Sequence, residues 1–251
     1  MLSRRLLLSM TPAVLPVVRA FAQPVLGVFG EDLVFDQLTN PLIPSLNSPG
    51  KFGFSKPTQE QIEKANEALN GTPKDQHPID IAESFIMRYA ASDPERISQW
   101  PAPQTWNPLI VEFFKATSLR VNNDMVDWCA AFVNWCIVRN NKAGTNSAGS
   151  QSFITSGKFI KTKTPRNGDL AVFTCYDAAR GKNLGIGHVG FFKADLGQER
   201  IRIVAGNQAK DRHSSIISEA DFSTKPFSVK RHVNGTLVPC IFKLNSYLSM
   251  S

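Results

Sequence analysis

The sequence predicts an α+β protein in which a run of helices precedes an antiparallel β-sheet. Apolar residues recur at helical spacing in several segments between residues 58 and 159. From residue 170 onward the apolar segments become short and rich in β-branched and aromatic residues, and turn-forming residues separate them. Helices followed by consecutive strands are typical of an α+β fold, whereas α/β folds alternate the two.

The helical segments carry recognisable start signals. Thr58 opens the first, Gln61 stands at capping-box spacing, and Asn70-Gly71 ends it. Asn107-Pro108 has the pattern of an N-cap followed by the first helical residue. Further helices are expected over 79–91, 128–138 and 151–159.

Five segments are predicted to be strands. They are short and apolar, and cover residues 170–175, 189–192, 201–204, 227–229 and 237–242. Residues 23–56 are rich in Pro, Gly, Asn and Ser, so we expect an irregular arm there. We therefore divide the chain into a signal segment (1–22), an arm and helical region of unknown role (23–106) and a main domain (107–251).

Composition excludes several classes of protein. The 251 residues include 42% hydrophobic and 20% charged residues, values that argue against disorder, a collagen-like repeat and a coiled coil. No uncharged apolar run reaches the roughly 18 residues of a membrane span. The net charge of +7 includes a basic cluster at 158–166, but no aromatic residues alternate with its charges as in a nucleic-acid platform. We expect neither nucleic acid nor a stable membrane span.

The first 22 residues have the pattern of an export signal. Arg4 and Arg5 precede an uncharged apolar stretch over 6–18, and Ala20-Phe21-Ala22 fits a cleavage site, after which Gln23 would begin the mature chain. Residues 3–8 also resemble a twin-arginine signal, although Leu7 and Ser9 depart from its pattern. We expect a periplasmic or secreted protein and leave the export route open. Cleavage removes three basic residues and no acidic one, which lowers the net charge from +7 to +4.

Cys129 is the strongest candidate nucleophile. With Asp127 as N-cap it would be the second residue of its helix, where free backbone N–H groups and the helix dipole stabilise a thiolate. A buried structural cysteine is the alternative. Cys136 falls on the apolar stripe of the same helix and is expected in the core.

A thiolate nucleophile needs a base, and His188 is the candidate among four histidines. Gly185 and Gly187 precede His188, and 189–192 follows as a strand, so a second side chain can approach the imidazole. If the next strand pairs with this one, Asn207 comes within reach of the ring and its amide oxygen can orient it. A turn asparagine beside glycine is the alternative.

These residues lie in segments that together resemble a known family. The segments are 127–136 (DWCAAFVNWC), 165–173, Gly187-His188-Val189-Gly190 and Gly206-Asn207-Gln208. In this order they resemble the CHAP and NlpC-type branch of papain-like cysteine peptidases and amidases, over about residues 107–222. The resemblance implies a papain-like fold, cleavage of amide bonds in bacterial peptidoglycan, and Cys129, His188 and Asn207 as nucleophile, base and orienting residue.

The implied reaction is acyl transfer through Cys129, with peptidoglycan stem peptides as partners. The oxyanion would be bound by the Cys129 backbone N–H and one other donor, for which Asn123 is a candidate. We expect no cofactor, no metal site and a monomer. Three alternatives stay open: transfer to an amine instead of water, a non-catalytic wall-binding module, and an antibacterial toxin.

Overall fold

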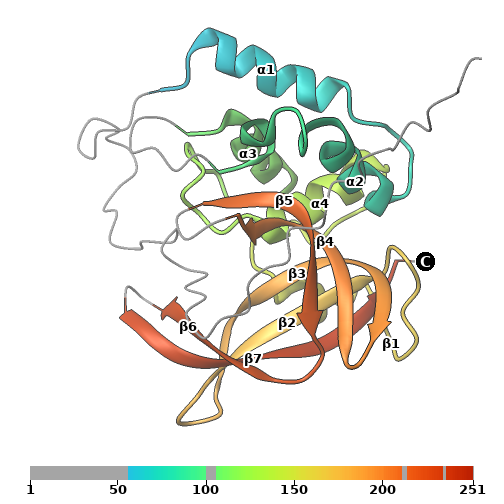
Figure 1. Ribbon diagram of the computed structural model, residues 1–251, viewed down its shortest axis with the longest axis vertical. Helices are drawn as coiled ribbons and strands as arrows, with labels where there is room; N and C mark the ends of the chain where they lie inside the picture. The colour runs from blue at the N-terminus through green and yellow to red at the C-terminus, as the bar shows by residue number, and fades with distance from the viewer. Residues whose placement is uncertain (1–55, 100–105, 211–213, 234–235, 251) are drawn as a thin grey trace, which may run out of the picture.

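The architecture agrees with the predicted α+β class. The structure, a computed structural model, describes residues 56–99, 106–210, 214–233 and 236–250, so the expected signal segment and arm lie outside the described residues. The helices lie together on one side of a curved antiparallel sheet (Figure 1). The helical elements are α1 (Gln59–Asn70), α2 (Pro78–Tyr89), η2 (Pro94–Ile97), α3 (Pro108–Phe113), η3 (Phe114–Ala116), α4 (Cys129–Arg139) and α5 (Ser152–Thr155).

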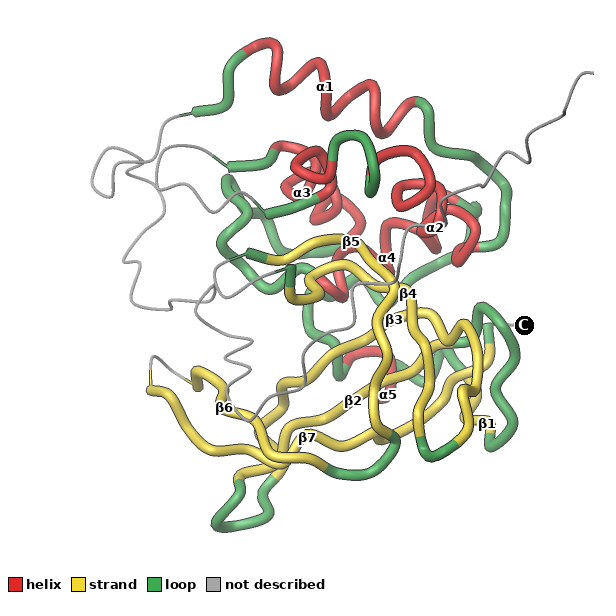
Figure 2. Tube along the Cα trace, in the orientation of Figure 1, coloured by secondary structure: helices red, strands yellow, loops and turns green. Residues whose placement is uncertain are grey.

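Within the described residues the sheet has seven strands, two more than the sequence indicated. They are β1 (Ile160–Thr162), β2 (Leu170–Asp177), β3 (Asn183–Gly197), β4 (Arg200–Ala209), β5 (Ser215–Ser223), β6 (Phe227–Val233) and β7 (Thr236–Ser249). The order is β1-β7-β2-β3-β4-β5, and β6 pairs with β7 alone (Figure 2). The expectation missed β1 and β5, and made β3 and β7 too short.

The predicted helix caps formed at two of the three sites. Thr58 and Gln61 make the reciprocal bonds of a capping box, and Asn107 accepts a hydrogen bond from the Leu109 N–H at 2.9 Å. The expected Asp127 cap on α4 is wrong, because Trp128 occupies the N-cap position and makes no side-chain cap. The helix expected over 151–159 is limited to one turn, α5.

Both faces of the sheet are covered by apolar side chains. The face toward the helices belongs to one core, to which β2 and β3 contribute Val172, Val189 and Phe191. The other face forms a second core, in which Phe173 stacks on Phe242 with ring centroids 5.1 Å apart. Because side chains alternate along a strand, consecutive residues of β2 and β3 serve different cores.

The N-terminal helices share the first core with α4. Ala65 of α1 and Phe85 of α2 are buried in the same cluster as Phe132 of α4. Arg139, at the end of α4, donates to the carbonyls of Leu69 and Thr72 at 3.0 and 2.7 Å, so it binds the last turn of α1 and the residues that follow it. The helical region before residue 107 is thereby joined directly to the helix that Cys129 begins.

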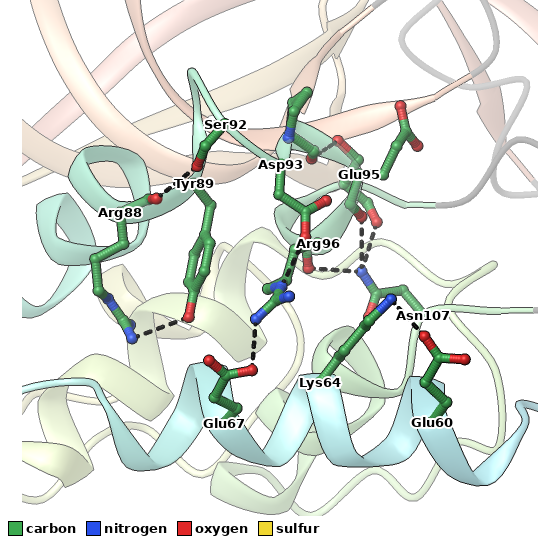
Figure 3. Close-up of polar contacts among 12 residues, drawn as sticks. Glu60, Lys64, Glu67, Arg88, Tyr89, Ser92, Asp93, Glu95, Arg96 and Asn107 are labelled. Carbon is green, nitrogen blue, oxygen red and sulfur yellow. Dashed lines mark hydrogen bonds and ion pairs between the residues drawn. The ribbon is translucent and has the colours of Figure 1, made fainter.

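A second group of contacts joins α1 to α2 and η2 (Figure 3). The guanidinium groups of Arg88 and Arg96 lie 4.8 and 4.9 Å from the centre of the Tyr89 ring. Arg96 also forms ion pairs with Glu67 and Asp93, each at 2.9 Å. This cluster lies on α1, α2 and η2 and contains neither Cys129 nor His188. Among the helices that the structure describes, none has the length and apolar character needed to cross a membrane.

Candidate active site

Cys129 is the first residue of α4, one position earlier than the sequence indicated. It is 3% exposed, and the backbone groups of Ala130 and Val189 act on its thiol. The first group lies at the start of its own helix and the second in β3. The helix beginning thus brings the thiol against the strand that carries His188.

Trp128 holds the start of α4 on the sheet. Its indole Nε1 donates to the Ser215 hydroxyl at 3.0 Å, and that hydroxyl in turn donates to the Gln99 side chain at 3.1 Å. The Trp128 ring also lies against Gly206, where an added Cβ would come within 2.3 Å of it. Glycine is therefore required at 206 for β4 to approach the residue that precedes Cys129.

The two strands that carry His188 and Asn207 pair as expected, but only in part. Antiparallel pairing of β3 with β4 runs from Gly197–Arg200 to Phe191–Val204 and stops there. Beyond it β4 contains a bulge between Ala205 and Gln208, with Asn207 in the left-handed region at φ 59°. Val189 of β3 lies beyond the last β3–β4 pair, and its backbone acts on the Cys129 thiol.

His188 lies in the second core. In the antiparallel ladder of β2 and β3 it lies opposite Phe173 of β2. Its ring stacks on the Phe222 ring of β5, with centroids 5.8 Å apart and 19° between planes. The imidazole is 3% exposed, and its Nε2 atom has no hydrogen-bond partner among the described residues. Burial, with a smaller contribution from the positive charge of Arg231, lowers the pKa of His188 to about 3.

Asn207 does not make the hydrogen bond that we expected. Its amide Nδ2 donates to the Asp127 carboxylate at 3.0 Å, and within the described part of the chain the Nε2 of His188 has no hydrogen-bond partner. The expectation assumed that pairing would continue to the ends of both strands. Because the bulge ends the pairing and turns residue 207 into a left-handed conformation, its side chain meets Asp127 instead.

The charges near Cys129 act on the thiol in opposite directions. Burial, followed by the negative charge of Asp127, raises its pKa to about 12. The two backbone groups and the positive charge of Arg231 lower it by less. In this closed arrangement Cys129 is a neutral thiol and His188 a neutral imidazole at pH 7.

The sequence reasoning missed Arg231, which acts on both Cys129 and His188. It lies on β6, is 6% exposed, and has its guanidinium carbon 5.5 Å from the centre of the Phe242 ring. The available signal was alternation: Phe227 and Val229 pack into the second core, so Arg231 is the next inward position. The short predicted strand, 227–229, ended before reaching it.

The other candidates have separate surroundings. Asn123 accepts a hydrogen bond from the Met125 N–H at 2.9 Å and donates to Asn122 at 2.8 Å, so its amide serves its own loop. Cys136 is buried in the first core, as expected. His77 is exposed, and His213 lies outside the described residues. Within the ranges described, no three His, Cys, Asp or Glu residues are grouped in a way that could hold a metal ion.

Comparison with known proteins identifies one family. Residues 121–207 match the CHAP domain family, and this span includes Cys129, His188 and Asn207 but not Arg231. Neither the curated proteins nor the solved structures contained a significant match. The match agrees with the family indicated by the sequence motifs.

Proposed function

Because residues 121–207 belong to the CHAP domain family, we propose that this chain hydrolyses amide bonds in bacterial peptidoglycan with Cys129 as nucleophile and His188 as base. CHAP domains generally indicate amidase or peptidase activity toward the cell wall. The roles of Cys129 and His188, and the amide bond that is cleaved, are our proposal. The observation that carries it is the packing of the start of α4, which Cys129 begins, against β3, the strand of His188, where the Val189 backbone acts on the Cys129 thiol.

The proposed reaction has two steps. The Cys129 sulfur attacks the amide carbonyl carbon, its proton passes to His188, and His188 gives that proton to the departing amine as the C–N bond breaks. Water then attacks the acyl-enzyme and gives a proton to His188, the C–S bond breaks, and His188 returns that proton to the Cys129 sulfur. The Cys129 backbone N–H, at the start of α4, is one donor to the oxyanion.

The resting state is inactive in this proposal. Cys129 and His188 are each 3% exposed and both are neutral, so a substrate has to enter and displace the side chains that cover them. Entry of a polar amide and of water reduces the desolvation that keeps the thiol protonated and the imidazole neutral. The ion pair that attacks the carbonyl would then form only with substrate present.

Asn207 contributes through Asp127 in this scheme. The Asp127 carboxylate raises the pKa of Cys129, and a hydrogen bond from the Asn207 amide at 3.0 Å disperses its negative charge. Asn207 is thus a positioning residue for Asp127, and not the partner of the imidazole. Asn207→Ala would slow the reaction but leave measurable turnover.

Digestion of purified sacculi tests the proposal. Wild-type protein should release soluble fragments, and Cys129→Ala and His188→Ala should each reduce release by more than about a thousandfold. Cys136→Ala is the matched control: it should digest at the wild-type rate while its free energy of unfolding falls by about 1–3 kcal/mol. Full digestion by Cys129→Ala would refute the assignment of the nucleophile.

Mass spectrometry of the fragments separates the alternatives. Hydrolysis leaves a free carboxyl and a free amine, whereas acyl transfer leaves a new amide when an amine is supplied. A wall-binding module would bind sacculi and release nothing. The cleaved bond, whether next to the sugar lactyl group, within the stem peptide or in the cross-bridge, follows from the fragment masses.

Export is a separate part of the proposal. It rests on the pattern of residues 1–22, and predicts an envelope form that begins at Gln23. N-terminal sequencing of the envelope fraction tests it, and full-length protein confined to the cytoplasm would refute it. Replacing Arg4 and Arg5 by Lys blocks export only if the twin-arginine route is used.

A further inference from the structure

Arg231 is a buried cation on an otherwise apolar row of β6. Phe227, Val229 and Arg231 alternate along the strand and face the second core, while Lys230 between them is exposed. A charged group at such a position loses its hydration and needs compensation by other groups. Placing a positive charge at this position costs desolvation free energy, so we expect Arg231 to do more than fill space.

The guanidinium and the imidazole of His188 lie on the same aromatic cluster. Arg231 lies over the Phe242 ring at 5.5 Å, and the Phe242 and Phe222 rings are 6.4 Å apart. His188 stacks on the other member of that pair, Phe222, at 5.8 Å. β6 therefore brings a permanent positive charge to the site, from a segment beyond the CHAP match.

This charge affects the two catalytic groups differently. It favours the Cys129 thiolate, but it opposes the protonated His188 that proton transfer from the thiol creates. The Asp127 carboxylate acts on the Cys129 thiol as well, and it accepts a hydrogen bond from Asn207. An additional anion beside Arg231 would relieve its repulsion of the imidazolium.

We propose that Arg231 is a specificity-determining residue that binds a carboxylate of the substrate next to the amide under attack. Arginine suits this task because its planar guanidinium presents five donors and pairs with a carboxylate through two parallel hydrogen bonds. With five donors it retains its contacts within the protein while it binds the substrate. A peptide offers such a carboxylate at its C-terminus and at each acidic side chain.

The proposal rests on the proposed function for the identity of the substrate. Its consequence is that the enzyme selects peptides with a free carboxylate and discriminates against the same peptides when that group is a carboxamide. The discrimination would appear in turnover as well as in binding, because the carboxylate also compensates the charge that opposes imidazolium formation.

Binding and turnover are measured with stem-peptide fragments in which each carboxylate in turn is converted to a carboxamide. In Cys129→Ala protein, which binds without cleaving, one of these conversions should weaken binding about 10- to 100-fold. Adding Arg231→Gln should abolish that preference, so that acid and amide bind equally. Adding Lys230→Gln, on the exposed side of the same strand, should leave it intact.

The outcomes separate this proposal from the proposed function. Equal binding of all acid and amide fragments to Cys129→Ala protein would overturn the role of Arg231, even if wild-type protein digests sacculi. A preference that depends on Arg231, without any turnover by wild-type protein, would support the site and refute hydrolysis. If Arg231→Gln does not fold, the binding of acid and carboxamide fragments to Cys129→Ala protein still tests the proposal, because equal binding would overturn it. An unchanged preference in Arg231→Gln would overturn the proposal.

Discussion

The buried imidazole of His188 makes the stability of the protein depend on pH. In the unfolded chain a histidine has its usual pKa of 6.5, whereas burial lowers that of folded His188 to about 3. Between these values only the unfolded state binds the proton. His188 thus leaves stability unaffected above pH 6.5 and reduces it progressively as the pH falls toward 3.

The size of this loss follows from the two pKa values. For each pH unit below 6.5, proton binding to unfolded His188 lowers the free energy of unfolding by about 1.4 kcal/mol. Between pH 8 and pH 5 the loss is therefore about 2 kcal/mol. In His188→Gln nothing titrates at this position, and the pH-dependent loss should be smaller by about 2 kcal/mol.

Urea unfolding at pH 8 and pH 5 measures the effect. Each protein is compared with itself at the two pH values, so a change in absolute stability caused by the substitution does not enter. His77→Gln is the matched control, because His77 is exposed and its replacement should leave the loss as in the wild type. If His188→Gln lost as much stability as the wild type, His188 would be hydrated in the folded state, and the neutral resting site would be wrong.

Two further substitutions test the surroundings of Cys129. Asp127→Asn removes the negative charge that raises the thiol pKa but keeps an acceptor oxygen, so alkylation of Cys129 by iodoacetamide at pH 8 should be several-fold faster; an unchanged rate would show that the carboxylate does not act on the thiol. Gly206→Ala places a methyl group 2.3 Å from the Trp128 ring and should lower the free energy of unfolding by about 1–3 kcal/mol in urea titrations. Gly149→Ala, whose nearest neighbour would be at 3.6 Å, should cost far less, and equal losses would contradict the proposed contact at Gly206.

The sequence predicted those elements whose ends depend on contacts between residues close together in the chain. The capping residues Thr58 and Asn107 mark their helices because each satisfies backbone N–H groups within its own turn. The position of Cys129 at a helix start was likewise predictable to within one residue. The order of helices and strands was enough for the fold class.

Features that depend on long-range contacts could not be obtained in this way. β5 was missed because its residues, SIISEADFS, alternate between two differently covered faces and include charged side chains. The partner of Asn207 depends on a bulge in β4; Gly206-Asn207 marks an irregular position there but does not indicate which side chain Asn207 meets. Arg231 joins the site only because β6 and β7 fold back over the second core.

The shared cores limit how the catalytic segment can be moved between proteins. The CHAP match at 121–207 carries Cys129 and His188. Phe85, which belongs to the same core as Cys129, and Phe222 and Phe242, which belong to the second core, lie outside the match. A gene fusion that transferred only the matched span would transfer the reactive groups without the apolar surfaces that enclose them. In this chain the transferable unit extends from α1 to β7, so duplication or exchange of the activity requires the flanking helices and strands to travel with it.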